Sequence, residues 1–207
     1  MNYFTYEGLT RYSYDSIATA LAEKTFHLIK RNWDSTGALW ENYNSITGEG
    51  NSHGAGGSTK HYSWSTALPL LAIMNSLDTD TWNQGLRFGS LGAASENRVS
   101  GLVIQNAEYD ASVGPNVTEL TRQGRRIFYA PNAVRVTAFA WSPEHVTFKY
   151  RTGDQSAGIP CEIGGMAAAA PLAKVDGKEM VSVALGGGDV ALSLPPGEHE
   201  VEIGGQH

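Results

Sequence analysis

The spacing of the apolar residues along this chain changes once, close to residue 78. Before that point apolar residues recur three and four positions apart, which is typical of amphipathic helices. After about Leu86, short runs alternate apolar and polar residues, with Gly, Pro, Asn and Asp between the runs. Helices followed by strands indicate two segregated units rather than an alternating α/β fold. We therefore expect an α + β protein with a helical segment over 1–77, a polar linker over 78–85 and an antiparallel β-sandwich over 86–207.

Three helices are expected in the first segment. Tyr3–Tyr12 is expected to be the end of one helix. A second begins at Asp15 or Ser16, either of which can cap it, and runs to about Asn32. A third is expected over Ser63–Leu77, where Pro69 is tolerable because it falls in the first turns.

Eight short runs in the second segment have the alternation expected of strands. Turn residues separate them at short intervals, as in antiparallel sandwiches. The runs are Val99–Gln105, Val117–Thr121, Arg125–Tyr129, Val134–Phe139, Val146–Tyr150, Val181–Leu185, Val190–Leu194 and Glu200–Ile203.

Composition narrows the possible function classes. Hydrophobic residues make up 41% and charged residues 17% of the 207 residues, which is enough for a folded core. The net charge is −6 and the largest basic cluster is Arg125-Arg126, so neither nucleic acid nor a membrane is an expected partner. A single cysteine, Cys161, excludes an internal disulfide and is expected to be a small buried hydrophobe. His53 and His61 lack a convincing third ligand, so we expect no metal and no cofactor.

A long loop, Trp33–Tyr62, joins the second and third predicted helices. Loops of this length are usually functional or disordered, and this one is rich in aromatic residues. The run Trp40-Glu41-Asn42-Tyr43-Asn44 places a carboxylate between two aromatic residues with amides beside it. Aromatic faces stack on sugar rings, amides bind hydroxyls and a carboxylate transfers protons. The residues alone indicate either a sugar site or an ordered loop whose aromatic side chains pack on the helices.

Several motifs in order resemble one enzyme family. The run from Trp40 to Asn44 with Thr47-Gly48, followed by Tyr62-Ser63-Trp64-Ser65 at the start of a helix, resembles the C-terminal catalytic region of glycoside hydrolase family 63 and of the related trehalases and mannosylglycerate hydrolases. The earlier segments Asn2-Tyr3-Phe4 and Glu7-Gly8-Leu9-Thr10-Arg11-Tyr12 are similar to the preceding helix of that family. The resemblance covers about residues 1–77 and extends, with weaker motifs, into the strand-rich segment.

The resemblance implies that residues 1–77 are the last helices of an (α/α)6 toroid and that the reaction is glycoside hydrolysis with inversion. In this mechanism an acid protonates the leaving oxygen and a base activates a water molecule, with about 6.5 to 9.5 Å between the two carboxyl groups. Glu41 matches the family's catalytic base. Trp40, Tyr43 and Trp64 would line the sugar pocket, and Asn42 or Asn44 would orient the carboxylate or bind hydroxyls.

The family's acid is an aspartate far upstream of the base. The resemblance therefore implies a C-terminal fragment that is inactive alone, with a carbohydrate substrate and the missing N-terminal part of the same enzyme as its partners. The start of the chain has no signal-peptide pattern, which favours a cytoplasmic location, although a truncated start would remove such a signal.

Two alternatives belong to other classes, a non-catalytic carbohydrate-binding module and a structural unit that braces the helical part. A pocket of Trp40, Tyr43 and Trp64 around Glu41 would favour the glycosidase. A row of exposed aromatic residues on one sheet face would favour the binding module. The sequence shows no such row, because Phe128, Tyr129, Phe139 and Trp141 fit core alternation at least as well.

Overall fold

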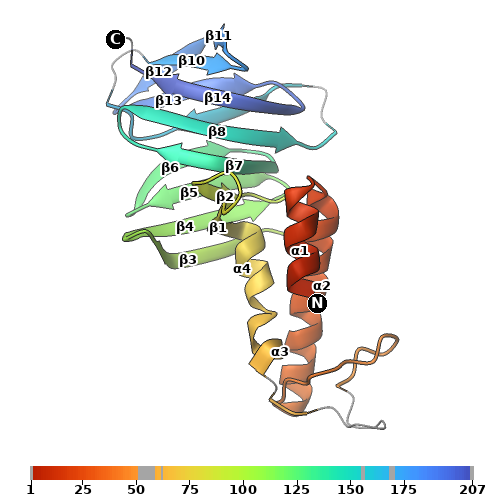
Figure 1. The fold of residues 1–207 in the computed structure, drawn as a ribbon. Helices are drawn as coiled ribbons and strands as arrows, with labels where there is room; N and C mark the ends of the chain where they lie inside the picture. The colour runs from red at the N-terminus through yellow and green to blue at the C-terminus, as the bar shows by residue number, and fades with distance from the viewer. Residues whose placement is uncertain (1, 51–58, 62, 155–156, 168–170, 206–207) are drawn as a thin grey trace. The chain divides into compact units, whose positions relative to one another are not determined.

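The computed structural model describes residues 2–50, 59–61, 63–154, 157–167 and 171–205 (Figure 1). The chain divides into two compact units, Met1–Met74 and Asn75–His207. Each unit is described by itself below. No helix in the described part of the chain is long and apolar enough to cross a membrane.

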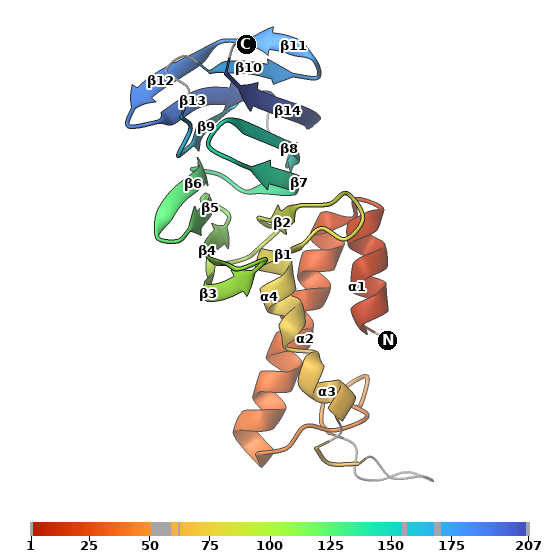
Figure 2. The same cartoon turned by 60° about the vertical axis from the view of Figure 1, so that its left-hand side comes forward.

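The first unit is built on two helices that lie side by side, α1 (Asn2–Arg11) and α2 (Asp15–Thr36) (Figures 1 and 2). The turn between them includes Ser13, whose φ is 66°. Buried residues from the two helices, together with Leu71, form a small apolar cluster of Tyr6, Ala18, Ala22 and Leu71. Helix α2 ends at Gly37, which adopts a left-handed conformation with φ of 62° and donates its N–H to the Trp33 carbonyl at 2.8 Å.

The third predicted helix is interrupted. Helix α3 covers only Ser63–Ala67, and after a turn at Leu68 and Pro69 helix α4 covers Leu70–Ser76. Proline has no N–H to donate and its ring collides with the carbonyl four residues earlier. Leu71 and Ala72 therefore bond to the carbonyls three residues before them, those of Leu68 and Pro69, each at 3.1 Å. The expectation that Pro69 would be accommodated within one continuous helix was wrong.

The expected fold class was also wrong. The described residues are mostly β, in two antiparallel sheets of seven strands, and they contain no (α/α)6 toroid. The toroid was an implication of the family resemblance, because helical spacing of apolar residues predicts that a helix forms but not how many helices surround a common core. Here the cluster around Tyr6 unites one short helix, one long helix and a broken third.

The second unit contains the two sheets. The first sheet has the strand order β1-β2-β7-β8-β14-β10-β11. Its strands are β1 (Leu77–Thr79), β2 (Leu86–Phe88), β7 (Val134–Trp141), β8 (His145–Thr152), β14 (Glu198–Gly204), β10 (Leu172–Val175) and β11 (Lys178–Met180).

The second sheet has the strand order β12-β13-β9-β6-β5-β4-β3. Its strands are β12 (Ser182–Gly186), β13 (Asp189–Leu194), β9 (Ile159–Ile163), β6 (Arg125–Ala130), β5 (Val117–Arg122), β4 (Ala107–Gly114) and β3 (Asn97–Ile104).

The core of this unit lies between the sheets, where alternate residues of both meet. Phe88, Phe139 and Phe148 of the first sheet pack around Phe128 of the second, with ring centroids 5.1 to 6.2 Å apart. Such edge-to-face contacts add to the stabilisation from burying the rings. Cys161 belongs to the same core and is 1% exposed, and this burial raises the pKa of its thiol.

Of residues 78–85, the expected linker, the first two belong to strand β1 and the others form the turn that leads to β2. Leu77 pairs with Phe88 and Thr79 pairs with Leu86, so the segment is a hairpin between β1 and β2. Asp80 is 4% exposed and bonds the backbone N–H groups of Trp82 and Asn83 at the turn. The polar composition that suggested a linker is the composition of a structured turn.

Candidate active site

The loop after α2 folds back on itself as an irregular hairpin. Trp40 pairs with Lys60 and Tyr43 pairs with Gly50 in two isolated antiparallel bridges. The Glu41 N–H donates to the Thr59 carbonyl at 3.0 Å, and the His61 N–H donates to the Leu39 carbonyl at 2.5 Å. The backbone on both sides of Glu41 is therefore held by hydrogen bonds.

Asn32 joins this hairpin to α2. Its side chain is buried, its Nδ2 donates to the Gly48 carbonyl at 2.8 Å and its Oδ1 accepts the Gly50 N–H at 2.9 Å. Arg31 adds a bond from Nη2 to the Thr47 carbonyl at 2.9 Å. A Cβ on Gly48 would lie 2.2 Å from Arg31 Nη2 and 2.8 Å from Leu28 Cδ1, so the loop backbone packs closely on the helix.

Asn44 shapes the tip of the hairpin. Its Oδ1 accepts the N–H groups of Ile46 at 2.8 Å and Thr47 at 2.9 Å, which is the pattern of an Asx turn. Its backbone bonds both Gly48 and Glu49. Asn44 thus has a structural role in the loop, and its amide oxygen already accepts two hydrogen bonds there.

The two aromatic residues near Glu41, Trp40 and Tyr43, pack within the loop and stabilise it. Trp40 is 6% exposed, the Lys60 ammonium lies 5.1 Å from its ring centroid, and the Ser65 hydroxyl donates to its carbonyl. A Cβ on Gly50 would overlap the Trp40 indole, so only glycine allows this close approach. The Tyr43 hydroxyl, from a half-buried side chain, accepts the Trp40 N–H at 3.0 Å.

Glu41 and Asn42 are two predicted site residues whose side chains lie exposed on the hairpin. Of the remaining predicted residues, Trp64 has its backbone in α3, but its side chain lies outside the described residues, as do Tyr62 and His53. The structure thus brings Trp40, Glu41 and Tyr43 together in one hairpin. It does not show an aromatic face of Trp40 open to a ligand.

Asn32 was not among the predicted site residues, although the sequence carried a sign of it. The buried face of α2 recurs at Ala18, Ala22, Thr25, Ile29 and Asn32. A polar amide that continues an apolar helical stripe must find hydrogen-bond partners when it is buried. In this structure the partners are two backbone groups of the loop, those of Gly48 and Gly50, and the Leu28 carbonyl of the same helix.

The chemistry available on the hairpin is that of an exposed carboxylate in a fixed backbone. A second carboxylate, Glu49, is also exposed and accepts a bond from the Thr47 hydroxyl at 3.3 Å. Within the described ranges, no group of three or more His, Cys, Asp or Glu residues is arranged to hold a metal ion.

Comparison of the chain with protein-family models, with curated proteins and with solved structures finds no match.

Proposed function

We propose that this chain is the part of an inverting glycoside hydrolase that carries the catalytic base, Glu41, and that its substrate is an oligosaccharide or a small glycoside. The observation that supports this most directly is that the neighbours of Glu41 make structural contacts within the loop, whereas Glu41 itself is exposed. Trp40, Tyr43 and Asn44 are used to build the loop, and Glu41 is left exposed on it. The resemblance of the run from Trp40 to Asn44 to family 63 gives the reaction class.

In this proposal the Glu41 carboxylate accepts a proton from the water that attacks the anomeric carbon. The hydrogen bond from its own N–H to Thr59 and the bonds of Asn32 to Gly48 and Gly50 limit the movement of the residue. A catalytic group must be held within a fraction of an ångström of its working position, and supporting hydrogen bonds provide this. In the family that the chain resembles, the general acid is an aspartate, and the proposal concerns the base alone.

The test is a titration of the ¹⁵N-labelled chain with a cationic iminosugar, which mimics the positive charge of the oxocarbenium-like transition state. We expect saturable shifts of the backbone amides of Glu41 and Asn42. The shifts should disappear in Glu41→Gln and persist in Glu49→Gln, which removes the other exposed carboxylate of the same hairpin. Equal shifts in wild type and Glu41→Gln would refute the assignment of Glu41.

A turnover assay tests the second half of the proposal. We expect the purified chain to leave aryl glycosides and disaccharides intact, because a base without its acid cannot complete the two-group mechanism. Robust hydrolysis that is lost in Glu41→Gln would show instead that the chain contains both groups.

A further inference from the structure

A polar pocket of about 690 Å³ lies at the edge of the β-sandwich unit, away from the residues of the Glu41 hairpin in the sequence. It forms where β2 stops pairing with β7 at Leu86 and Phe139. The next two residues of β7, Ala140 and Trp141, pair with β8 through Thr147 and Val146, and have no other strand partner within the described residues. The volume falls in the range of about 300 to 1,000 Å³ that is usual for small-molecule sites.

A buried carboxylate, Asp80, holds in place two lining residues of the pocket, Asn83 and Ala138. Asp80 Oδ1 accepts the N–H groups of Trp82 and Asn83, and Oδ2 accepts the Ala138 N–H at 3.0 Å. Ala138 has a φ of 52° and lies in the bulge of β7 between Thr137 and Ala140. Asp80 therefore fixes both the turn before β2 and the bulge that faces it. Bulges often redirect side chains beside binding sites.

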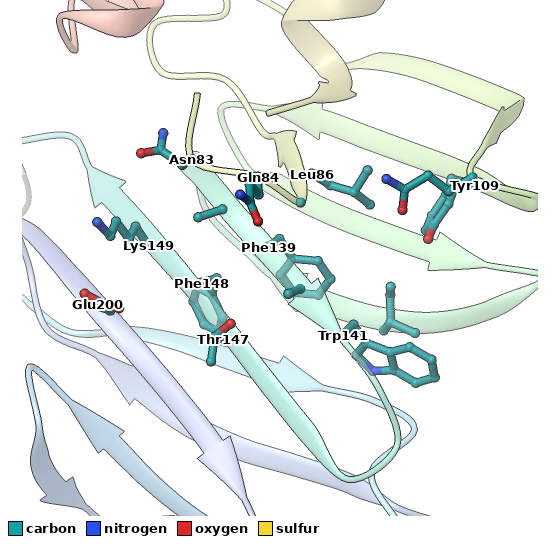
Figure 3. A pocket seen from close by; sticks show the side chains of 15 residues that line it. Asn83, Gln84, Leu86, Tyr109, Phe139, Trp141, Thr147, Phe148, Lys149 and Glu200 are labelled. Atoms are coloured by element: carbon teal, nitrogen blue, oxygen red, sulfur yellow. The ribbon is translucent and has the colours of Figure 1, made fainter. Parts of the chain in front are cut away.

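The lining also carries two aromatic residues that are locked in place. Trp141 donates its Nε1–H to the Gly164 carbonyl at 3.0 Å, and the Arg122 guanidinium lies 5.3 Å from its ring centroid. Arg122 Nε also donates to the Tyr109 hydroxyl at 3.3 Å. Figure 3 shows Tyr109 and Trp141 on one side of Phe139, with Asn83, Lys149 and Glu200 on the other. Rings fixed before binding lose little freedom when a ligand stacks on them.

Primary amides supply the hydrogen-bonding groups. Gln84 and Gln105 line the pocket from two different turns, and both side chains are exposed. Both residues have positive φ, 66° and 49°, so each turn has an unusual backbone at the pocket. An amide both donates and accepts, and so matches the hydroxyl groups of a sugar.

The charge of the lining decides between ligand classes. Its two charged residues are Lys149 and Glu200, which are register partners on β8 and β14 and have opposite signs. The lining therefore has no net charge and offers no cluster of cations for a phosphate or an acidic polymer. We propose that this pocket binds a neutral saccharide, with Trp141 and Tyr109 as the stacking faces and Gln84 and Gln105 as the hydroxyl-binding groups. Glu41 is not among the lining residues, and the inference does not depend on the catalytic proposal.

The experiment is titration of the full-length chain with a panel of neutral di- and trisaccharides, followed by ¹H–¹⁵N spectra of backbone, glutamine side-chain and tryptophan indole groups. We expect at least one sugar to shift the Gln84, Gln105 and Trp141 signals in a saturable way. The double variant Gln84→Ala/Gln105→Ala should bind that sugar about tenfold or more weakly, because hydrogen bonds on two sides are lost.

Gln123→Ala is the matched control. Gln123 is also exposed and also has a positive φ, 51°, in a tight turn before Gly124, but it does not line the pocket. The Gln123→Ala variant should bind the sugar with wild-type affinity. Glu41→Gln should also bind it with wild-type affinity, which would show that binding to this pocket does not require Glu41. Binding that survives the double variant unchanged, or no binding by any neutral sugar at millimolar concentration, would overturn the inference. Preferential binding of inorganic phosphate or an acidic oligosaccharide would overturn it too.

Discussion

At the scale of single residues, His199 is a titratable side chain whose surroundings favour its charged form. Its Nδ1 lies 2.7 Å from Asp176 Oδ2 and its Nε2 lies 3.0 Å from the Pro196 carbonyl. The hydrogen bond to Asp176, followed by that to Pro196, raises the pKa of His199 above 6.5. Asp176 accepts the Glu200 N–H as well, and that bond, followed by the bond to His199, lowers the Asp176 pKa below 3.8.

These shifts predict a pH dependence of folding. The contribution of His199 to the free energy of unfolding is complete below pH 6.5, and it is lost as the pH rises through the raised pKa of the folded state. The contribution of Asp176 is complete above pH 3.8, and it is lost as the pH falls through the lowered pKa of the folded state. Between pH 5 and pH 8.5 the free energy of unfolding of wild type should therefore fall relative to that of His199→Gln. Denaturant unfolding at the two pH values measures this difference. An identical pH dependence in wild type and His199→Gln would contradict the prediction.

At the scale of elements, Asn32 is the buried side chain of α2 that bonds the Glu41 hairpin, and Arg31 adds a bond to the Thr47 carbonyl. Asn32→Leu keeps the buried position filled but removes the bonds to Gly48 and Gly50. Leaving these two backbone groups without a partner should destabilise the docked loop by about 1 to 3 kcal/mol. Hydrogen exchange of the Gly50 amide should accelerate by roughly ten- to a hundredfold, since each 1.4 kcal/mol is a factor of ten.

The control for this change is Ser35→Ala, one turn further along α2. Among the residues that the structure describes, the Ser35 hydroxyl bonds only carbonyls of its own helix, those of Arg31 and Asn32. It should leave exchange at Gly50 unaltered. Unchanged exchange in Asn32→Leu would mean that the loop does not need this anchor.

The elements also show what the sequence could and could not predict. Each of the eight expected runs overlaps a strand, because alternation over several residues reflects a sheet with one buried face. Strand β4 was not expected, because two of its buried residues are the small Ala107 and Ala111, Glu108 and Asp110 lie between them, and its apolar pattern is weak. The hairpin around Glu41 was expected only as a loop. Its shape comes from contacts between residues far apart in sequence, such as Asn32 with Gly50, which no local pattern contains.

At the scale of the whole molecule, the two units differ in how much apolar surface they bury. In the described part of the first unit, the main apolar cluster is Tyr6, Ala18, Ala22 and Leu71. Phe4 and Tyr12 of this unit are 72% and 69% exposed, and Ile17 and Trp33 are each more than half exposed. The second unit buries a continuous core of Phe, Val, Ile and Leu between its sheets. Because burial of apolar surface is the main stabilising contribution, the two units should differ in stability.

We expect amides of α1 and of the middle of α2 to exchange faster than those of β7 and β8, after correction for intrinsic rates, since local opening is easiest where few apolar contacts are lost. Mass spectrometry of peptic peptides measures both units in one sample, so each unit serves as the reference for the other. The measurement should be repeated at tenfold dilution, because association through Phe4, Tyr12 or Trp33 would protect the helices at high concentration only. Helices that remain as protected as the central strands at both concentrations would show that the first unit is stabilised by more than the cluster around Tyr6.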